Sequence, residues 1–244
     1  MRVIGVIPTR LDSKRFPGKA LALLHGKPLI QHVYESARKS LILDELVIAT
    51  DDKKIYNAAV GFGAPVVITP REYHCGTDRV AHAVSALSCE IVVNIQGDQP
   101  LLAPETIDSV VKKLLGLNGL PAATPIYPIN DREDLIDPNV VKVVRDSYGY
   151  ALYFSRSPIP YIRGRLDDIS LTYKHIGIYA YRKDFLCEFA KLPPSLLEIT
   201  EGLEQLRILE NGYKIMTVQS IFDSPSVDSE EDLRKLQEMI GNSK

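Results

Sequence analysis

The sequence predicts an α/β protein with a mostly parallel sheet and an appended, mixed α+β portion. Up to about residue 120, short β-branched runs bounded by turn residues alternate with amphipathic stretches of helical period. Such alternation is typical of parallel strands joined by right-handed crossovers. Beyond that point strand-like runs recur with fewer helices between them, which indicates a change of architecture.

The alternating elements can be assigned in chain order. Each expected strand is a short apolar run, and the strands are expected at residues 3–7, 46–49, 66–68 and 91–95. The amphipathic stretches that predict helices cover residues 29–39, 53–60, 77–87 and 104–115. Ligands of open parallel sheets bind beyond the carboxyl ends of the strands. The loops at residues 8–19, 50–52 and 96–100 are therefore the ones to search for chemistry.

The appended portion is assigned from its own strand-like runs. We expect strands at residues 140–145, 151–154, 172–181 and 214–219, with a charged loop around Pro158, Pro160 and Gly164. Near the end of the chain, Asp228 or Ser229 is expected to start a helix that carries the amphipathic run 233–240.

Composition narrows the function. The chain has 244 residues, enough for one domain with a substantial core, and it is 45% hydrophobic and 25% charged with a net charge of -2. These values are ordinary for a globular protein and disfavour a nucleic-acid-binding role. Three widely spaced cysteines suggest neither a disulfide framework nor a zinc site, and no apolar run is long enough for a signal peptide or a membrane span. We therefore expect a cytoplasmic protein.

The first loop, P-T-R-L-D-S-K-R-F-P-G-K, directly follows the first expected strand. It holds the densest cationic cluster of the chain, formed by Arg10, Lys14, Arg15 and Lys19. Together with Ser13 and Gly18, these side chains could cradle a triphosphate, because Arg and Lys neutralise phosphate oxygens and glycine allows close backbone approach. The loop matches neither a Walker motif nor G-x-G-x-x-G. A solvated basic loop is the alternative, and it is weakened by the position of the loop after a strand.

The second loop, N-I-Q-G-D-Q-P from Asn94, places Asp98 at the carboxyl end of an apolar strand. A carboxylate there is suited to hold Mg²⁺ that bridges phosphate oxygens. The alternative is an aspartate that only stabilises a turn, which is the commoner use of Gly-Asp. The cationic first loop favours the interpretation of Asp98 as a Mg²⁺ ligand over that of a turn-stabilising aspartate.

These segments resemble the 3-deoxy-manno-octulosonate cytidylyltransferase family, the CMP-Kdo synthetases, and the resemblance covers almost the whole chain. The N-terminal segments that carry it are V-I-P-T-R-L-D-S-K-R-F-P-G-K, G-K-P-L-I-Q-H-V, A-T-D-D, H-C-G-T-D-R and N-I-Q-G-D-Q-P. The later segments are V-K-V-V, G-Y-A-L-Y-F-S-R-S-P-I-P, K-H-I-G-I-Y-A-Y, L-E-Q-L-R and V-D-S-E-E-D-L. Together they are highly specific.

The resemblance implies a Rossmann-like nucleotide-diphospho-sugar transferase fold and a single domain over residues 1–244. Its nucleotide-binding core would comprise residues 1–120 and 205–244, and residues 121–204 would form a sugar-binding and dimerisation portion. The implied reaction is transfer of CMP from CTP to the anomeric hydroxyl of 3-deoxy-D-manno-octulosonate (Kdo), with release of pyrophosphate, for lipopolysaccharide biosynthesis. The implied cofactor is Mg²⁺, and the implied assembly is a homodimer.

The resemblance also assigns roles to residues. Arg10 and Lys19 would act in catalysis by holding the triphosphate, and Asp98 and Asp228 by holding Mg²⁺. The residues implied in nucleotide binding are Arg10, Ser13, Arg15, Lys19, Gly76, Thr77 and Gln96. On residue chemistry alone, Thr77 is also a good helix N-cap and Asp78 a favourable first-turn acid. Family members commonly carry serine at Cys75.

The sugar end of the substrate needs a cation for its carboxylate and polar groups for its hydroxyls. The residues at the matching positions are Gln96, Arg156, His175, Glu201, Glu204 and Gln205. Glu201, Glu204 and Gln205 share a face at helical spacing, so they could converge on a ligand, although a solvated face is the default for this pattern. A lone histidine in a strand is likewise more often structural.

Three departures from the family pattern are Thr9 for alanine, Gln99 for glutamate and a shorter loop from Pro158 to Lys174. We expect the last two to lie near sugar and dimer surfaces, and they leave the 8-amino analogue of Kdo open as substrate. A CMP-sialic acid synthetase usually carries Q-P-T-S-P in place of Q-G-D-Q-P, and a sugar-1-phosphate nucleotidyltransferase has a different first loop. A non-catalytic nucleotide-sugar-binding protein remains the alternative from another class.

Overall fold

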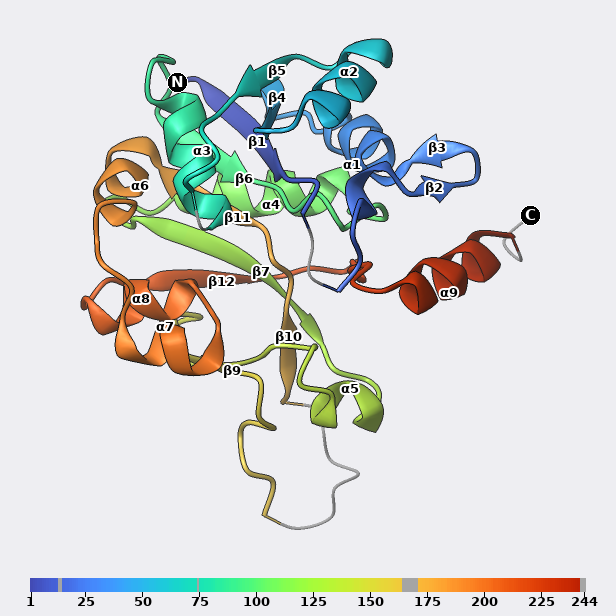
Figure 1. Cartoon of the computed structure of the whole chain (residues 1–244). Helices are drawn as coiled ribbons and strands as arrows, with labels where there is room; N and C mark the ends of the chain where they lie inside the picture. The colour runs from blue at the N-terminus through green and yellow to red at the C-terminus, as the bar shows by residue number, and fades with distance from the viewer. Residues whose placement is uncertain (13–14, 74, 164–170, 242–244) are drawn as a thin grey trace. The chain divides into compact units, whose positions relative to one another are not determined.

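The computed structural model describes residues 1–12, 15–73, 75–163 and 171–241 (Figure 1). The chain forms two compact units. Unit 1 comprises Met1–Asp108 and Ser224–Lys244, and unit 2 comprises Ser109–Asp223. The predicted single domain, with its division near residues 120 and 205, stays a prediction. No helix in the described ranges is long and apolar enough to cross a membrane.

Unit 1 is built on parallel strands in the order β5-β4-β1-β6. Strand β1 (Val3–Thr9) lies between β4 (Glu45–Thr50) and β6 (Ile91–Asn94), and β5 (Val66–Ile68) extends the sheet beside β4. Most of β1, β4 and β6 is buried, as expected for parallel strands covered on both faces. The prediction of an α/β protein with a parallel sheet is confirmed.

The crossover helices of unit 1 follow their predicted ranges closely. They are α1 (Leu29–Ala37), α2 (Lys53–Gly61), α3 (Gly76–Val84) and α4 (Pro104–Leu115), of which α4 runs across the boundary between the units. Helix α2 begins where the Asp52 carboxylate accepts hydrogen bonds from the N–H groups of Lys54 and Ile55. Between β1 and α1 lie the short elements η1 (Lys19–Leu21), β2 (Leu23–Leu24) and β3 (Lys27–Pro28).

The C-terminal helix α9 (Glu230–Gly241) packs against the first loop through a separate hydrophobic cluster. The buried members of this cluster are Phe16, Leu24, Leu29, Val227 and Leu236. The helix start predicted at Ser229 is confirmed, because the Ser229 N–H and hydroxyl bond to the Asp232 carboxylate and the Asp232 N–H bonds back to the hydroxyl. Two ends of the chain are thereby joined by apolar contact.

Unit 2 is centred on β7 (Ala122–Pro128), which the sequence pattern did not predict. It pairs with β12 (Ile215–Gln219) in parallel and with β10 (Tyr173–His175) and β11 (Tyr179–Arg182) in antiparallel orientation. Strand β8 (Lys142–Arg145) pairs with β10 and with β9 (Ala151–Ser155), at which the sheet ends. The helices of this unit are α5 (Arg132–Ile136), α6 (Lys183–Phe189), α7 (Leu196–Glu201) and α8 (Gln205–Glu210).

One strand prediction in unit 2 is wrong. Residues 172–181 do not form a continuous strand but are divided into β10 and β11. Between them the N–H of Ile176 bonds to the Pro125 carbonyl, and the N–H of Ile178 bonds to the carbonyl of Ile176 itself, which makes a tight local turn. The interruption leaves His175 as the last residue of β10.

Replacing Leu236 by alanine tests whether the cluster under α9 is a stabilising core. Leu236 is 4% exposed. We expect Leu236→Ala to lower the free energy of unfolding of unit 1 by about 2–3 kcal/mol, because it leaves a cavity among Phe16, Leu24 and Val227. Urea titration followed by circular dichroism measures the change. Met239→Ala is the matched control on the same helix, with Met239 57% exposed, and an equal loss in both variants would contradict the assignment.

Candidate active site

A lysine and two carboxylates meet in unit 1. The Lys19 Nζ lies 2.7 Å from Asp98 Oδ2 and 3.1 Å from Asp228 Oδ1. The Arg15 guanidinium binds the other oxygen of Asp228, Oδ2, at 3.0 Å. The cationic loop, the turn after β6 and the segment before α9 therefore supply one constellation, and four residues predicted from the sequence to share a site are in contact.

The first loop is held in place by backbone and apolar contacts. The N–H of Gly18 bonds to the Leu11 carbonyl at 3.0 Å, and the N–H of Lys19 bonds to the Phe16 carbonyl at 3.1 Å. Gly18 has φ 74°, a left-handed conformation that favours glycine. Between Arg15 and Lys19, the Phe16 ring enters the hydrophobic cluster beside Val227, the residue before Asp228. The apolar contact thus sets the distance between the cations and Asp228.

A second connection joins the two carboxylate-bearing segments. The N–H of Val227 bonds to the Asp98 carbonyl at 2.9 Å, and the Gln99 Nε2 donates to the Ser224 carbonyl at 3.3 Å. Gln99 is 5% exposed, and its predicted place near the sugar and dimer surfaces stays a prediction. Its amide fastens the turn after β6 to the segment that leads to Asp228.

The electrostatic balance at Lys19 favours its charged form. Burial acts to lower the pKa of the Lys19 ammonium, but the contacts with Asp98 and Asp228 outweigh it and hold that pKa above its ordinary value. Lys19 is therefore a fixed cation at neutral pH. Its side chain is 15% exposed and the carboxylates are about a quarter exposed, at 24% and 25%, so solvent screens the pair only in part.

Helix α3 brings the predicted nucleotide-binding residues Gly76 and Thr77 to the carboxyl end of β1. A Cβ placed on Gly76 would lie 3.6 Å from the Pro8 ring. The predicted N-cap at Thr77 is wrong, because the helix begins at Gly76 and the Cys75 Sγ accepts the hydrogen bond from the Asp78 N–H at 3.4 Å. Thr77 is instead a buried residue of the first turn.

A buried arginine on α3 connects the ends of two further strands. The Arg79 guanidinium binds Asp51 at 3.1 Å and also contacts the Thr69 hydroxyl, and its side chain is 2% exposed. Asp51 follows β4 and Thr69 follows β5. This ion pair fixes the start of α3 against the segments that follow β4 and β5. The sequence pattern did not predict a role for Arg79.

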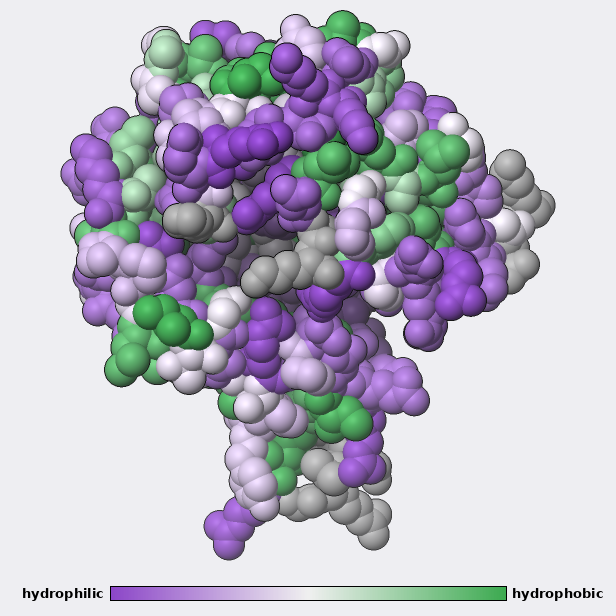
Figure 2. All heavy atoms as spheres, viewed as in Figure 1, coloured by the Kyte–Doolittle hydropathy of each residue, from purple (hydrophilic) through white to green (hydrophobic). Residues whose placement is uncertain are grey.

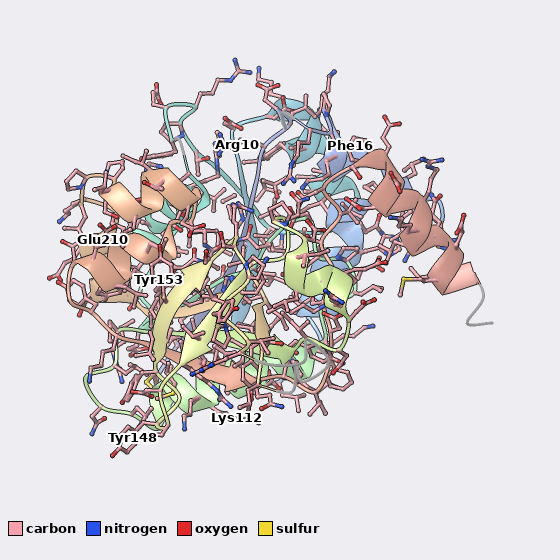
Figure 3. All side chains as sticks on the ribbon, turned by 90° about the horizontal axis from the view of Figure 1, so that it is seen from below. Arg10, Phe16, Lys112, Tyr148, Tyr153 and Glu210 are labelled. Carbon is pink, nitrogen blue, oxygen red and sulfur yellow. The ribbon has the colours of Figure 1, made fainter. Side chains whose placement is uncertain are left out.

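The remaining predicted site residues of unit 1 lie close in sequence to Lys19 or Asp98. Arg10 is exposed just beyond β1 (Figure 3), and Gln96 is half-buried in the turn after β6. Ser13 lies outside the described residues. Thr9, at the end of β1, approaches the turn so closely that a Cβ on Gly97 would lie 2.9 Å from its hydroxyl. Glycine is therefore required where this turn passes β1.

In unit 2, Glu201 and Arg156 form a hydrogen-bonded group. The Glu201 carboxylate accepts from the Ser155 hydroxyl at 2.7 Å and from the Arg156 N–H at 2.9 Å, with the Tyr153 hydroxyl at 3.4 Å. Burial acts to raise the pKa of Glu201, but these donors and the Arg156 charge hold it below its ordinary value. The Arg156 guanidinium donates to the main-chain carbonyls of Glu201 and Pro138, both at 2.8 Å.

His175 is a neutral residue in an aromatic setting. Its Nε2 lies 2.9 Å from the Thr124 hydroxyl, and its ring packs edge-on to Phe154 and beside Tyr179. Burial lowers the pKa of His175 to about 3. At neutral pH the imidazole is uncharged, so it can orient a polar ligand group but cannot neutralise a carboxylate.

The last two predicted sugar residues start helix α8. Gln205 is 6% exposed, and its Nε2 finds no hydrogen-bond partner among the described residues. Glu204 is the N-cap position of the same helix. A buried amide without a partner is costly unless a ligand or water satisfies it, so its chemistry fits the predicted ligand contact.

The parallel sheet of unit 1, with cations and two carboxylates beyond its strand ends, defines a nucleotide-dependent transferase. The chain belongs to the cytidylyltransferase family, whose model matches residues 4–215. The predicted family resemblance and the predicted enzyme class are confirmed.

Individual relatives are similar over almost their whole length. A 3-deoxy-manno-octulosonate cytidylyltransferase of Geobacter sulfurreducens is 47% identical, with 98% of this chain and 100% of the relative covered. One of Chloroherpeton thalassium, named the same, is 48% identical, with 98% of both chains covered. A solved structure of a CMP:2-keto-3-deoxy-manno-octonic acid synthetase complexed with CTP is 37% identical, covers 100% of both chains and has a TM-score of 0.92.

The close approach of Thr9 to Gly97 can be tested by a double substitution. We expect Gly97→Ala to destabilise the protein by about 1–3 kcal/mol, because the new methyl group would clash with the Thr9 hydroxyl. Thr9→Ala in the same chain should recover more than half of that loss. Urea unfolding of both single variants and the double variant measures the coupling. Gly61→Ala, with open space at its Cβ position, is the control, and simple additivity would refute the contact.

The neutral state of His175 predicts a pH dependence of stability. The unfolded chain takes up a proton near pH 6.5, whereas the folded protein does so only near pH 3. Stability from this group is therefore fully present above pH 6.5 and declines as the pH falls toward 3, by about 2–3 kcal/mol between pH 6.5 and 4.5. His175→Gln should flatten the curve of unfolding free energy against pH by that amount. Parallel curves would show that His175 titrates normally.

Proposed function

We propose that this protein transfers CMP from CTP to the anomeric hydroxyl of 3-deoxy-D-manno-octulosonate, giving CMP-Kdo and pyrophosphate for lipopolysaccharide biosynthesis. The observation that carries the proposal is the convergence of Lys19 and Arg15 on Asp98 and Asp228. The names of relatives 43–48% identical over 98% of the chain support the choice of nucleotide and sugar.

The cations of the first loop bind the triphosphate in this mechanism. Arg10, Arg15 and Lys19 neutralise charge that develops on phosphate oxygens while the sugar hydroxyl attacks the α-phosphorus and pyrophosphate departs. The attack needs no covalent enzyme intermediate, so catalysis rests on alignment and charge. Ser13, Gly76, Thr77 and Gln96 complete the nucleotide contacts.

Asp98 and Asp228 fit a magnesium ion. Their oxygens already converge on a single ammonium nitrogen, and carboxylate oxygen is the donor that Mg²⁺ prefers. Within the described residues no group of three or more His, Cys, Asp or Glu side chains could hold a metal. Two carboxylates suit Mg²⁺, which commonly takes its remaining ligands from substrate phosphates and water. When bound, the ion would neutralise negative charge on the phosphate groups.

Unit 2 supplies the groups for the sugar acid. Arg156 provides the cation for the carboxylate, and His175 meets the sugar as a neutral polar group. Glu201, Glu204 and Gln205 provide hydrogen-bonding groups, of which the buried Gln205 amide most needs a partner.

We also propose that the protein is a cytoplasmic homodimer. All three cysteines are described and none forms a disulfide, which suits a reducing compartment. Strand β9 and the residues after it expose Leu152 and Tyr161, at 61% and 89%. Figure 2 shows apolar surface in this lower part of unit 2. An exposed sheet edge with apolar side chains is suited to pair with a second copy, and analytical ultracentrifugation measures this directly.

The reaction is tested by assaying pyrophosphate release over four nucleoside triphosphates and a panel of sugar acids, including Kdo, its 8-amino analogue and sialic acid. We expect release with CTP and Kdo. Asp98→Asn should lower kcat by about a hundredfold or more, because the metal-binding carboxylate loses its charge, while the protein still folds, since the carbonyl of residue 98 keeps its hydrogen bond from the Val227 N–H.

Asp52→Asn is the matched control for Asp98→Asn. It makes the same change in unit 1 at an N-cap, where asparagine serves as well as aspartate, so activity should persist. No release with CTP and any 3-deoxy-ulosonic acid would refute the proposed function. Near-normal turnover of Asp98→Asn would refute only the metal assignment.

A further inference from the structure

Lys142 on β8 is fully buried, with 0% of the residue exposed. Its Nζ donates to the main-chain carbonyls of Asp137 at 2.8 Å and Val140 at 2.6 Å. Among the described residues it forms no ion pair with a carboxylate at 4 Å or less. A buried ammonium whose hydrogen bonds go only to carbonyl oxygens is expensive. Burial lowers the pKa of Lys142, although the charges of Asp137, Glu201 and Asp134 act to raise it. Its charge therefore calls for an explanation beyond packing.

The turn that Lys142 holds is also bound by Arg156. The Arg156 Nη1 donates to the carbonyl of Pro138, which lies between the two carbonyls that Lys142 binds. In the antiparallel pairing of β8 and β9, Lys142 stands opposite Ser155, the neighbour of Arg156. The two cations are close enough for the Arg156 charge to oppose protonation of Lys142. Both side chains thus brace a single turn, residues 137–140.

Carboxylates compensate these two charges only in part. Asp137 and Glu201 are the carboxylates whose charges most favour protonated Lys142. The Asp137 carboxylate accepts from the Asn139 N–H and amide, and the Glu201 carboxylate accepts from the Ser155 hydroxyl and the Arg156 N–H. The guanidinium itself donates to the main-chain carbonyls of Glu201 and Pro138. A neutral donor would satisfy the carbonyls of the turn equally well. A second positive charge is useful there if the group is to hold an anion.

We propose that Lys142 is a positioning residue for the anionic sugar acid, which holds the turn that braces Arg156 and adds a buried positive charge behind it. This inference rests on the proposed function, in which Arg156 receives the sugar carboxylate. Lys142 acts through Arg156 and through its field, without touching the substrate. The consequence is specific: loss of Lys142 weakens recognition of the carboxylate and leaves recognition of CTP unchanged.

Lys142→Met tests this by keeping side-chain length and removing the charge. We expect KM for Kdo to rise about tenfold and KM for CTP to stay within about twofold, as for the loss of one nearby charge. Arg182→Met is the matched control, because Arg182 also lies in unit 2 and donates to the carbonyls of Leu114, Leu117 and Leu120. Both variants lose a cation that caps carbonyls and should lose thermal stability, but Arg182→Met should leave both KM values unchanged.

A sugar analogue that lacks the carboxylate charge separates the electrostatic effect of Lys142 from its effect on folding. Inhibition constants are measured for Kdo-type acids and for the corresponding C1 carboxamide in wild type, Lys142→Met and Arg182→Met. The preference for the acid should shrink about tenfold in Lys142→Met only. Lys142→Gln, which retains a neutral donor, serves if the methionine variant does not fold. A full preference for the acid in an active, folded Lys142 variant overturns the inference, whereas a wild type that transfers CMP to no sugar acid refutes the proposed function itself.

Discussion

The contact of Lys19 with Asp98 and Asp228 is the interaction on which the arrangement of unit 1 depends. A partly buried cation between two carboxylates is favourable only where the geometry is held, since desolvation otherwise offsets the attraction. The geometry is held by apolar packing of Phe16 against Val227 and by the hydrogen bond from the Val227 N–H to the Asp98 carbonyl. The C-terminal segment therefore returns to unit 1 because it completes both the hydrophobic cluster and the charged constellation.

Three charged residues of unit 2 are held by a different means. Arg156 and Lys142 are held by main-chain carbonyls, and Glu201 is held by hydroxyl and N–H donors. Carbonyl dipoles orient a cation without cancelling its charge, whereas a carboxylate partner would cancel it. The group is thus pre-organised before any ligand arrives, which spares the enzyme the cost of reorienting dipoles during the reaction. The two units share a principle: the backbone sets the distances between charges.

Local sequence pattern predicted the elements of unit 1 well and failed where tertiary contacts decide. The bounds of β5 and α4 agree with their predicted ranges because apolar runs and turn residues coincide there. The central strand β7 was missed because Pro125 and Pro128 break a strand pattern, yet β12 and β10 pair along it and the Pro125 carbonyl still accepts a bond. Similarly, V-K-V-V predicts a strand but cannot show that its lysine is buried. Motifs found the charged residues, while their supports lie too far apart in sequence for a local pattern to detect.

The buried position of Gln99 changes the meaning of one departure from the family pattern. The Gln99 Nε2 donates to the Ser224 carbonyl, a bond that an ionised glutamate could not make, because it has no proton to give. A glutamate would also place an ionised carboxylate at a position that is 5% exposed, which is costly without a partner. The neutral amide thus suits this buried position. Residue 99 consequently bears on the alignment of the two segments that carry Asp98 and Asp228, because its amide joins the turn after β6 to the Ser224 carbonyl.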